Sequence, residues 1–284
     1  MNLDIFTIFQ SSGYLHITPG LVVMWFIGIV LIYLAIARKY EPLLLLPIGF
    51  GIILANLPLT DLMHEGEGLI WRFYHYGIQW EIIPPLIFLG LGALTDFKPL
   101  LANPVLIFLG AGAQVGVYIT FFTAYGLGFS INEAATIGII GGADGPTTIF
   151  LAAKLAPHLL GVCAVAAYSY MAMVPIIQPP IMKLLTTKKE RLIKMKKARK
   201  VSQLEKLFFP IIATFIIILL IPASAPLISM FMLGNLFRES KVVERLTTAS
   251  KNELMNIVTI FLGISIGATM SAENFLRNAP IFIF

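Results

Sequence analysis

The chain has 284 residues, of which 58% are hydrophobic and only 12% are charged. A soluble domain would carry about a quarter charged residues, so the composition excludes an ordinary soluble enzyme. The net charge of +5 does not indicate a nucleic-acid partner, because ten of the twenty lysines and arginines lie in one segment, residues 183–206. The sequence therefore predicts an all-α, multi-pass protein of the inner or plasma membrane that binds no nucleic acid.

Nine apolar segments are predicted to form helices in the membrane. In chain order they are residues 21–37, 43–58, 82–95, 105–129, 134–157, 159–182, 207–221, 225–236 and 257–270. The second and third are shorter than the ~20 residues that a spanning helix needs. Broken or re-entrant helices of this kind line the sites of many transporters, whereas a tilted or buried helix fits both segments equally well. Pro175, Pro179 and Pro180 are expected to break the sixth segment.

The basic segment, KLLTTKKERLIKMKKARKVSQLEK, follows the sixth predicted helix. Cytoplasmic loops carry an excess of Lys and Arg, so this loop is predicted to face the cytoplasm. Its charge could also attract anionic lipid or an acidic partner, although control of orientation is the interpretation that we favour.

Two segments of the chain echo each other. Residues 87–108 read IFLGLGALTDFKPLLANPVLIF, and residues 260–284 read IFLGISIGATMSAENFLRNAPIFIF. Both segments begin with IFLG, and a Gly-Ala pair follows in each, Gly92-Ala93 in the first and Gly267-Ala268 in the second. The echo predicts a helical bundle that is the first part of an inverted-repeat, transporter-like fold. In this interpretation residues 1–284 form a single membrane domain, and its second repeat begins at about residue 257 and is cut off at residue 284.

Residues 138–150 read GIIGGADGPTTIF, which places the carboxylate of Asp144 among glycines inside an apolar segment. An ionised carboxylate at bilayer depth costs at least ~2.5 kcal/mol on insertion scales, so it must be paired, protonated, hydrated or bound to a cation. The glycines on both sides and Pro146 disfavour a regular helix. A helix break beside Asp144 is therefore predicted.

Such a break would free backbone carbonyls, among them that of Gly142. These carbonyls, the Asp144 carboxylate and the hydroxyls of Thr147 and Thr148 make up a set of hard oxygen donors, which binds Na⁺ at unwound backbone in several transporters. The residues thus predict a partial Na⁺ site at Asp144, Gly142, Thr147 and Thr148. The structural alternative is that Asp144 caps a half-helix that begins at Pro146, and capping and ion binding can coexist.

The next segment contains YSYMAMVPIIQPP, in which Tyr168 and Tyr170 are two residues apart. Residues at this spacing do not share a helix face, so only one of the two is expected to point at Asp144. A tyrosine in a membrane helix is more often a packing or interfacial residue, and the spacing alone gives neither a role.

The stretch GIIGGADGPTTIF, followed by AVAAYSYMAMVPIIQPPIMKLLTTKKER, closely resembles the β subunits of sodium-pumping carboxylic acid decarboxylases. These subunits serve oxaloacetate, methylmalonyl-CoA, glutaconyl-CoA and malonate decarboxylases. The segments EPLLLLPIGFG, PPLIFLGLGALTDFKPLLANP and KVSQLEKLFFPI match as well, so the resemblance covers nearly the whole chain.

The resemblance implies a carboxybiotin decarboxylase subunit that takes up a proton and exports Na⁺. Its biotin would be presented by a carboxyltransferase α subunit or by a separate biotin carrier. A small membrane subunit of the γ/δ type and a homo-oligomeric assembly are also implied. By motif position, Asp144 takes the place of the essential Na⁺-site aspartate, and Tyr170 takes that of the tyrosine implicated in Na⁺ and proton coupling. Both are therefore catalytic candidates, while the residues that bind the cofactor stay unassigned.

Members of this family run well past residue 284, into a half that completes the ion and carboxybiotin sites, so this chain is expected to hold only part of the site. Two other functions fit the residues themselves. A cation-coupled secondary transporter needs the same carboxylate and carbonyl ligands without decarboxylation. A membrane scaffold could hold soluble enzymes through the basic loop. Dependence of Na⁺ movement on a biotinylated partner separates the decarboxylase subunit from the secondary transporter.

Overall fold

The computed structural model describes residues 12–194 and 198–277, and within these residues every regular element is a helix. The longer helices are α2 (Pro19–Ala37), α3 (Pro42–Ala55), α5 (Ile83–Leu94), α7 (Ile107–Gly126), α8 (Ile131–Ile140), α9 (Gly145–Leu155), α10 (Leu160–Leu185), α12 (Gln203–Leu220), α13 (Ala225–Ser240) and α15 (Met255–Thr269). The shorter elements are η1 (Gly13–His16), α4 (Leu69–Arg72), η2 (Phe73–Gln79), α6 (Lys98–Ala102), η3 (Pro104–Leu106), η4 (Pro157–Leu159), α11 (Lys188–Arg191), η5 (Pro222–Ser224), α14 (Glu244–Ala249), η6 (Ser250–Leu254) and α16 (Ala272–Arg277).

The described residues contain five helical stretches that are long and apolar enough to cross a membrane. A sixth candidate is the pair Leu69–Gln79 and Ile83–Leu94, whose two parts are bent by 63° at a short break. The third predicted segment is therefore the second part of a broken helix, and the second predicted segment is the 14-residue helix α3. The prediction of an all-α, polytopic membrane protein with broken helices is confirmed.

Prolines and polar caps set where several of these helices begin. Pro19 and Pro42 stand in the first turns of α2 and α3, where the missing N–H costs no hydrogen bond. Ser130 begins α8 with a capping box. The Ser130 hydroxyl accepts a hydrogen bond from the Glu133 N–H, and the Glu133 carboxylate accepts one from the Ser130 N–H.

The expected break at the prolines of the sixth segment is wrong. Helix α10 continues from Leu160 to Leu185 with Pro175, Pro179 and Pro180 inside it. Pro175 and Pro179 are four residues apart, so they lie on one face of the helix, and that face is exposed. Prolines are tolerated in membrane helices, where local adjustment compensates for the lost hydrogen bonds.

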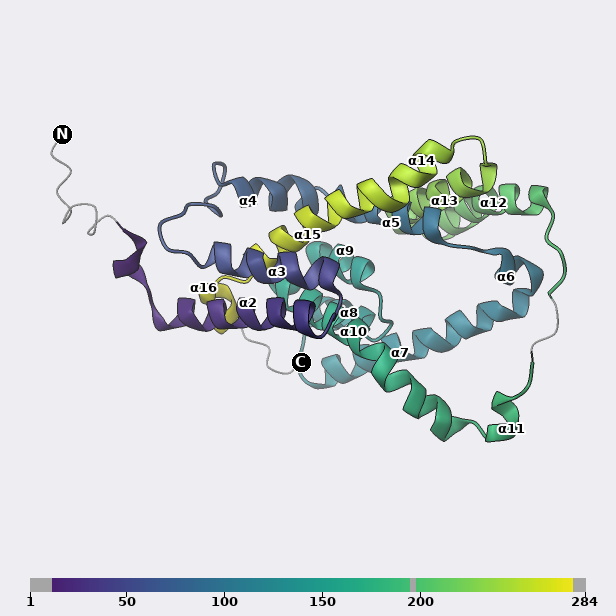
Figure 1. The fold of residues 1–284 in the computed structure, drawn as a ribbon, viewed down its shortest axis with the longest axis horizontal. Helices are drawn as coiled ribbons and strands as arrows, with labels where there is room; N and C mark the ends of the chain where they lie inside the picture. Colours follow the sequence, from purple (N-terminus) through teal and green to yellow (C-terminus); the bar gives the residue numbers. More distant parts are fainter. Residues whose placement is uncertain (1–11, 195–197, 278–284) are drawn as a thin grey trace.

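The helices form two interlocked pairs. Helix α2 packs on α3 and α12 packs on α13, while α3 packs against α15 and α13 packs against α5. Figure 1 shows α2 and α3 at one end of the molecule, α12 and α13 at the other, and α5 and α15 running between the two ends. Each half of the chain therefore supplies one helix to each of the two interlocked pairs, α3–α15 and α5–α13.

Glycines allow the closest approach in both interlocked pairs. A Cβ atom on Gly92 of α5 would lie 1.9 Å from the carbonyl oxygen of Phe231, and one on Gly267 of α15 would lie 2.1 Å from that of Ile48. Gly92 and Gly267 are also matched in the sequence echo. This packing agrees with a duplicated helical unit. The inverted relation and the boundary at about residue 257 stay predictions, and the end of the second copy, residues 278–284, lies outside the described residues.

Helices α7 to α10 make up the rest of the chain's first half. Helix α7 packs on α8, α9 packs on both α8 and α10, and α10 reaches α3 and α15. The main hydrophobic core joins this unit to the interlocked pairs, with Ile48, Ile149, Tyr168 and Leu262 all buried in one cluster. The break between α8 and α9 is thereby held close to helices from both halves of the chain.

Candidate functional site

The predicted helix break lies at residues 141–144. Helix α8 ends at Ile140, and α9 begins at Gly145. Ala143, between them, has a φ of 55°, which is left-handed backbone that non-glycine residues rarely adopt outside strained, often functional, sites. A Cβ atom on Gly141 would lie 2.5 Å from the carbonyl oxygen of Gly116 in α7, so only glycine lets the break pack there. The close packing against α7 holds the strained backbone of the break in place.

Asp144 is the N-terminal cap of α9. Its Oδ1 accepts a hydrogen bond from the Thr147 N–H at 3.0 Å, and its Oδ2 accepts one from the Thr147 hydroxyl at 2.6 Å. The Thr148 hydroxyl donates to the Asp144 carbonyl oxygen at 2.7 Å. The side chain thus lies at the positive end of the α9 dipole, which attracts negatively charged groups. The capping geometry that the sequence left open is therefore present, and it keeps Asp144 in one orientation.

The half-buried carboxylate of Asp144 lines a cavity of about 490 Å³ between the two halves of the chain. Its lining comes from the α8–α9 break and α10, from α5, from Glu41 and Leu44 at the start of α3, and from α13 and α15. The last two helices contribute Phe231 and Thr259, respectively. The cavity is thus built by elements that are distant in sequence and meet only through the interlocked packing.

The cavity contains two carboxylates and, among the described residues that line it, no Lys, Arg or His. The second carboxylate, Glu41, precedes Pro42 and has left-handed backbone, with a φ of 36°. Neither carboxylate takes part in an ion pair within the described part of the chain. Two unpaired carboxylates in a partly apolar cavity attract a cation.

The structure places the predicted site residues at different distances from the cavity. Thr147 and Thr148 are hydrogen-bonded to Asp144 but do not line the cavity. Gly142 lies in the break, two residues before Asp144. Tyr170 is partly exposed and is not among the lining residues, whereas Tyr168 is one of them. The roles assigned to these residues stay predictions.

Sequence reasoning missed Glu41, Thr259 and the part that Tyr168 plays in the cavity. A carboxylate directly before a proline and an apolar helix was a signal that could have drawn attention to Glu41. Thr259 gave no such signal, since a threonine in an apolar helix is common and its neighbours across the fold are set only by tertiary packing.

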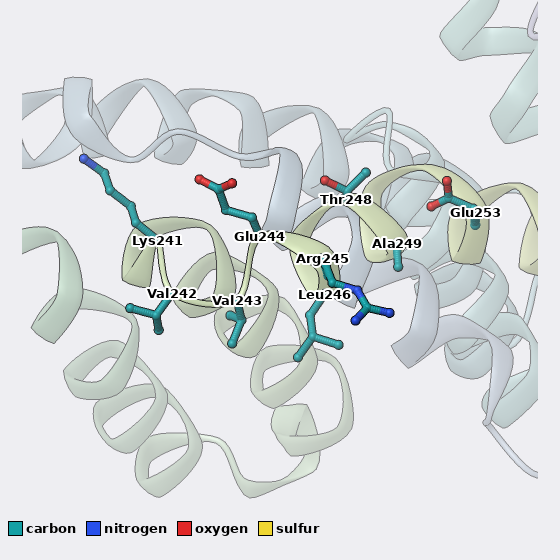
Figure 2. A pocket seen from close by; sticks show the side chains of 9 residues that line it. All are labelled: Lys241, Val242, Val243, Glu244, Arg245, Leu246, Thr248, Ala249 and Glu253. Atoms are coloured by element: carbon teal, nitrogen blue, oxygen red, sulfur yellow. The ribbon is translucent and has the colours of Figure 1, made fainter.

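A larger hollow, of about 1100 Å³, lies at the turn between α13 and α14. Figure 2 shows Lys241, Glu244 and Thr248 on one side of this turn and helix, with Val242 and Leu246 on the other. Side chains of both charges line the hollow, so it favours neither a cation nor an anion. The cavity at Asp144 is the candidate site.

The fold and the site together define a polytopic membrane protein with a carboxylate at a broken helix, the arrangement of ion-translocating proteins. The family model "Na+-transporting oxaloacetate decarboxylase beta subunit" matches residues 20–284. The chain belongs to this family.

Three relatives have more specific names. The chain is 57% identical to the methylmalonyl-CoA decarboxylase subunit beta of Veillonella parvula and 54% identical to the glutaconyl-CoA decarboxylase subunit beta of Acidaminococcus fermentans, over 98% of this chain and 73% of each relative. It is 46% identical to the oxaloacetate decarboxylase beta chain of Haemophilus ducreyi, over 99% of this chain and 78% of the relative. These findings support a subunit of a multi-subunit, Na⁺-translocating decarboxylase, and they do not support a secondary transporter without decarboxylation.

Proposed function

We propose that the cavity at Asp144 is where this chain holds Na⁺, the ion that the protein carries as a substrate across the membrane. One observation carries the proposal: a carboxylate at a helix break faces a cavity that contains a second carboxylate and, among the described residues, no basic side chain. A hard cation balances the negative charge of these carboxylates and is coordinated by oxygen donors of the protein.

The donors around Asp144 fit such an ion. The Thr147 hydroxyl donates a hydrogen bond to the Asp144 carboxylate and the Thr148 hydroxyl donates one to the Asp144 carbonyl oxygen, so each hydroxyl oxygen keeps lone pairs that are available to a cation. The carbonyl of Gly142 belongs to the break and lies beyond the last residue of α8. We assign these four residues to one part of the ligand set, and Asp144 supplies its charge.

The chemistry that we propose is the decarboxylation of carboxybiotin presented by a partner subunit. The bond between the biotin nitrogen and the carboxyl carbon breaks, CO₂ leaves, and the electron pair stays on the nitrogen, which takes up one proton. This proton uptake is proposed to be coupled to the export of the Na⁺ held at Asp144. Tyr170 is proposed to take part in this coupling.

The partners that we propose are a biotin-carrying α subunit or separate carrier, a small membrane subunit of the γ/δ type, and further copies of this chain. Family membership supports a complex of several subunits. The basic loop between α10 and α12 is proposed to face the cytoplasm, where a soluble biotin carrier works.

The test is Asp144→Asn in the assembled complex, with carboxybiotin turnover measured against Na⁺ concentration. Asparagine keeps an oxygen that can accept from the Thr147 N–H, so the helix cap remains, whereas the charge and the second acceptor, which binds the Thr147 hydroxyl, are lost. We expect Na⁺-dependent turnover to fall by at least ~100-fold, as when an essential charge is removed from a buried site.

The matched control is Asp61→Asn, in a loop far along the chain from the break, where asparagine tolerates the left-handed backbone of Asp61. This variant should keep the turnover and the Na⁺ dependence of the parent complex. Parental turnover and Na⁺ dependence in Asp144→Asn would overturn the proposed site.

A further inference from the structure

Tyr168 is a buried polar residue that is not part of the ligand set proposed for Na⁺. It is 1% exposed, and its hydroxyl is one of two buried side-chain groups in the described part of the chain that have no hydrogen-bond partner. The other, the Ser265 hydroxyl on α15, does not line the cavity at Asp144. A buried hydroxyl without a partner is unfavourable, so a ligand that satisfies it is expected.

The packing of Tyr168 brings its hydroxyl end to the start of α9. A Cβ atom on Gly145 would lie 2.4 Å from Cε1, 2.6 Å from Cζ and 3.0 Å from the hydroxyl oxygen of Tyr168. The polar edge of the ring therefore lies against the backbone of the residue that follows Asp144. Tyr168, Asp144 and Glu41 all line the same cavity.

We propose that the hydroxyl oxygen of Tyr168 is a neutral ligand of the cation held at Asp144, an inference that rests on the proposed function. A phenol oxygen has lone pairs for a hard cation, and its proton can then be donated to a carboxylate across the cavity. Glu41 is the second carboxylate in that cavity. Glycine at position 145 is required because any side chain would displace the ring from this place.

This role is distinct from that of Tyr170. The two residues lie on different faces of α10, and only Tyr168 lines the cavity. A ligand of the ion acts on the concentration of Na⁺ that half-saturates the protein and on the choice between cations. A residue that only fills space would change stability in the absence of Na⁺ and leave both of those quantities alone.

The experiment is Tyr168→Phe in the assembled complex in detergent, with the thermal midpoint measured against NaCl, LiCl and KCl, and turnover measured against NaCl. Phenylalanine keeps the ring packed on Gly145. We expect the half-saturating Na⁺ concentration to rise about tenfold, as for one lost oxygen ligand. The ratio of the Li⁺ to the Na⁺ midpoint shift should change as well. Tyr125→Phe, on the exposed side of α7, is the control and should change none of these values.

Gly145→Ala provides an independent variant that keeps every oxygen donor but pushes the ring away, and it should also raise the half-saturating Na⁺ concentration. If Tyr168→Phe keeps the half-saturating Na⁺ concentration and the cation selectivity of the parent, the role of Tyr168 is overturned. If that variant does not assemble, the same result in Gly145→Ala overturns it. The proposed function fails separately, if Asp144→Asn keeps the Na⁺ response. Loss of that response in Asp144→Asn, with no change in the two ring variants, would leave Asp144 as the site and remove Tyr168 from it.

Discussion

The side-chain amide of Asn235 donates a hydrogen bond to the carbonyl oxygen of Thr95, 2.9 Å away and 140 positions earlier in the chain. Asn56 does the same for Met270, also at 2.9 Å, across 214 positions. Thr95 and Met270 directly follow α5 and α15, where helix carbonyls have no partner within the helix. Each half of the chain therefore satisfies the end of a helix from the other half, in a region where water is scarce.

Asn56→Ala is expected to destabilise the fold by about 1–3 kcal/mol, because it leaves a buried carbonyl and N–H unpaired. Asn56 is buried, donates to the carbonyls of Ile52 and Met270, and accepts from the Ala272 N–H at 2.7 Å. The measurement is the thermal midpoint of the purified protein in detergent. Asn132→Ala, at an exposed position at the start of α8, should leave the midpoint nearly unchanged. Equal effects of the two variants would show that the Asn56 bonds do not hold the halves together.

Gly267→Ala should destabilise the α3–α15 contact by about 1–3 kcal/mol, through overpacking in a closely packed interface. The added methyl group would lie 2.1 Å from the carbonyl oxygen of Ile48 and 2.8 Å from the Ile52 nitrogen. Gly110→Ala is the matched variant, since a Cβ atom there meets nothing within 4 Å. That change should be neutral or stabilising, because alanine favours a helix over glycine. A destabilisation of the same size at Gly110, where the added methyl group meets no atom, would show that close packing is not the cause of the effect at Gly267.

The helix break at Asp144 could be predicted from the sequence because it is local. The glycines and Pro146 act on their own backbone, and Asp144 caps the next turn, so thirteen consecutive letters, residues 138–150, contain the signal. The prolines of α10 lie inside a continuous helix, because the surroundings of a membrane helix can compensate for the hydrogen bonds that proline removes. The local sequence does not show this compensation.

The interlocked packing could not be predicted in the same way. Helices α2 and α3 are apolar on nearly every side, so no hydrophobic stripe indicates which face meets which neighbour. The lining of the cavity could not be predicted for the same reason, because Phe231 and Thr259 line it together with Asp144 only through the packing of α13 and α15. The orientation of Tyr168 depends on Gly145, a contact across two helices that spacing alone does not give.

The loop between α10 and α12 is expected to face the cytoplasm, because half of the basic residues lie in residues 183–206. A cysteine at Lys189, an exposed position in α11, should resist an impermeant thiol reagent in intact cells and react after permeabilisation. The native Cys163 is buried and is replaced by alanine to remove background. Labelling of the Lys189 position in intact cells would reverse the proposed orientation.

Tyr170→Phe is expected to lower turnover of the assembled complex at saturating Na⁺ by about tenfold or more, as for the loss of a group that moves a proton. This expectation comes from the resemblance, which makes Tyr170 part of the coupling between proton uptake and Na⁺ export. Its effect should fall on the maximal rate, whereas Tyr168→Phe should change the half-saturating Na⁺ concentration. The measurement is turnover against Na⁺ for both variants side by side. Identical curves for the two would leave no distinct role for Tyr170.

Asp144 combines a helix cap with a charge, and two substitutions separate these contributions. Asp144→Asn keeps the oxygen that accepts from the Thr147 N–H, so the thermal midpoint without Na⁺ should stay close to that of the parent. Asp144→Ala removes the cap as well and should cost about 1 kcal/mol, the usual loss at the start of a helix. The Asn variant also relieves the unfavourable burial of a charge when no cation is present, which acts against any small loss at the cap. Both variants should lose stabilisation by Na⁺, with K⁺ as the control salt. If only Asp144→Ala lost it, the intact start of α9 would be what binds the ion, and the carboxylate charge would not be required.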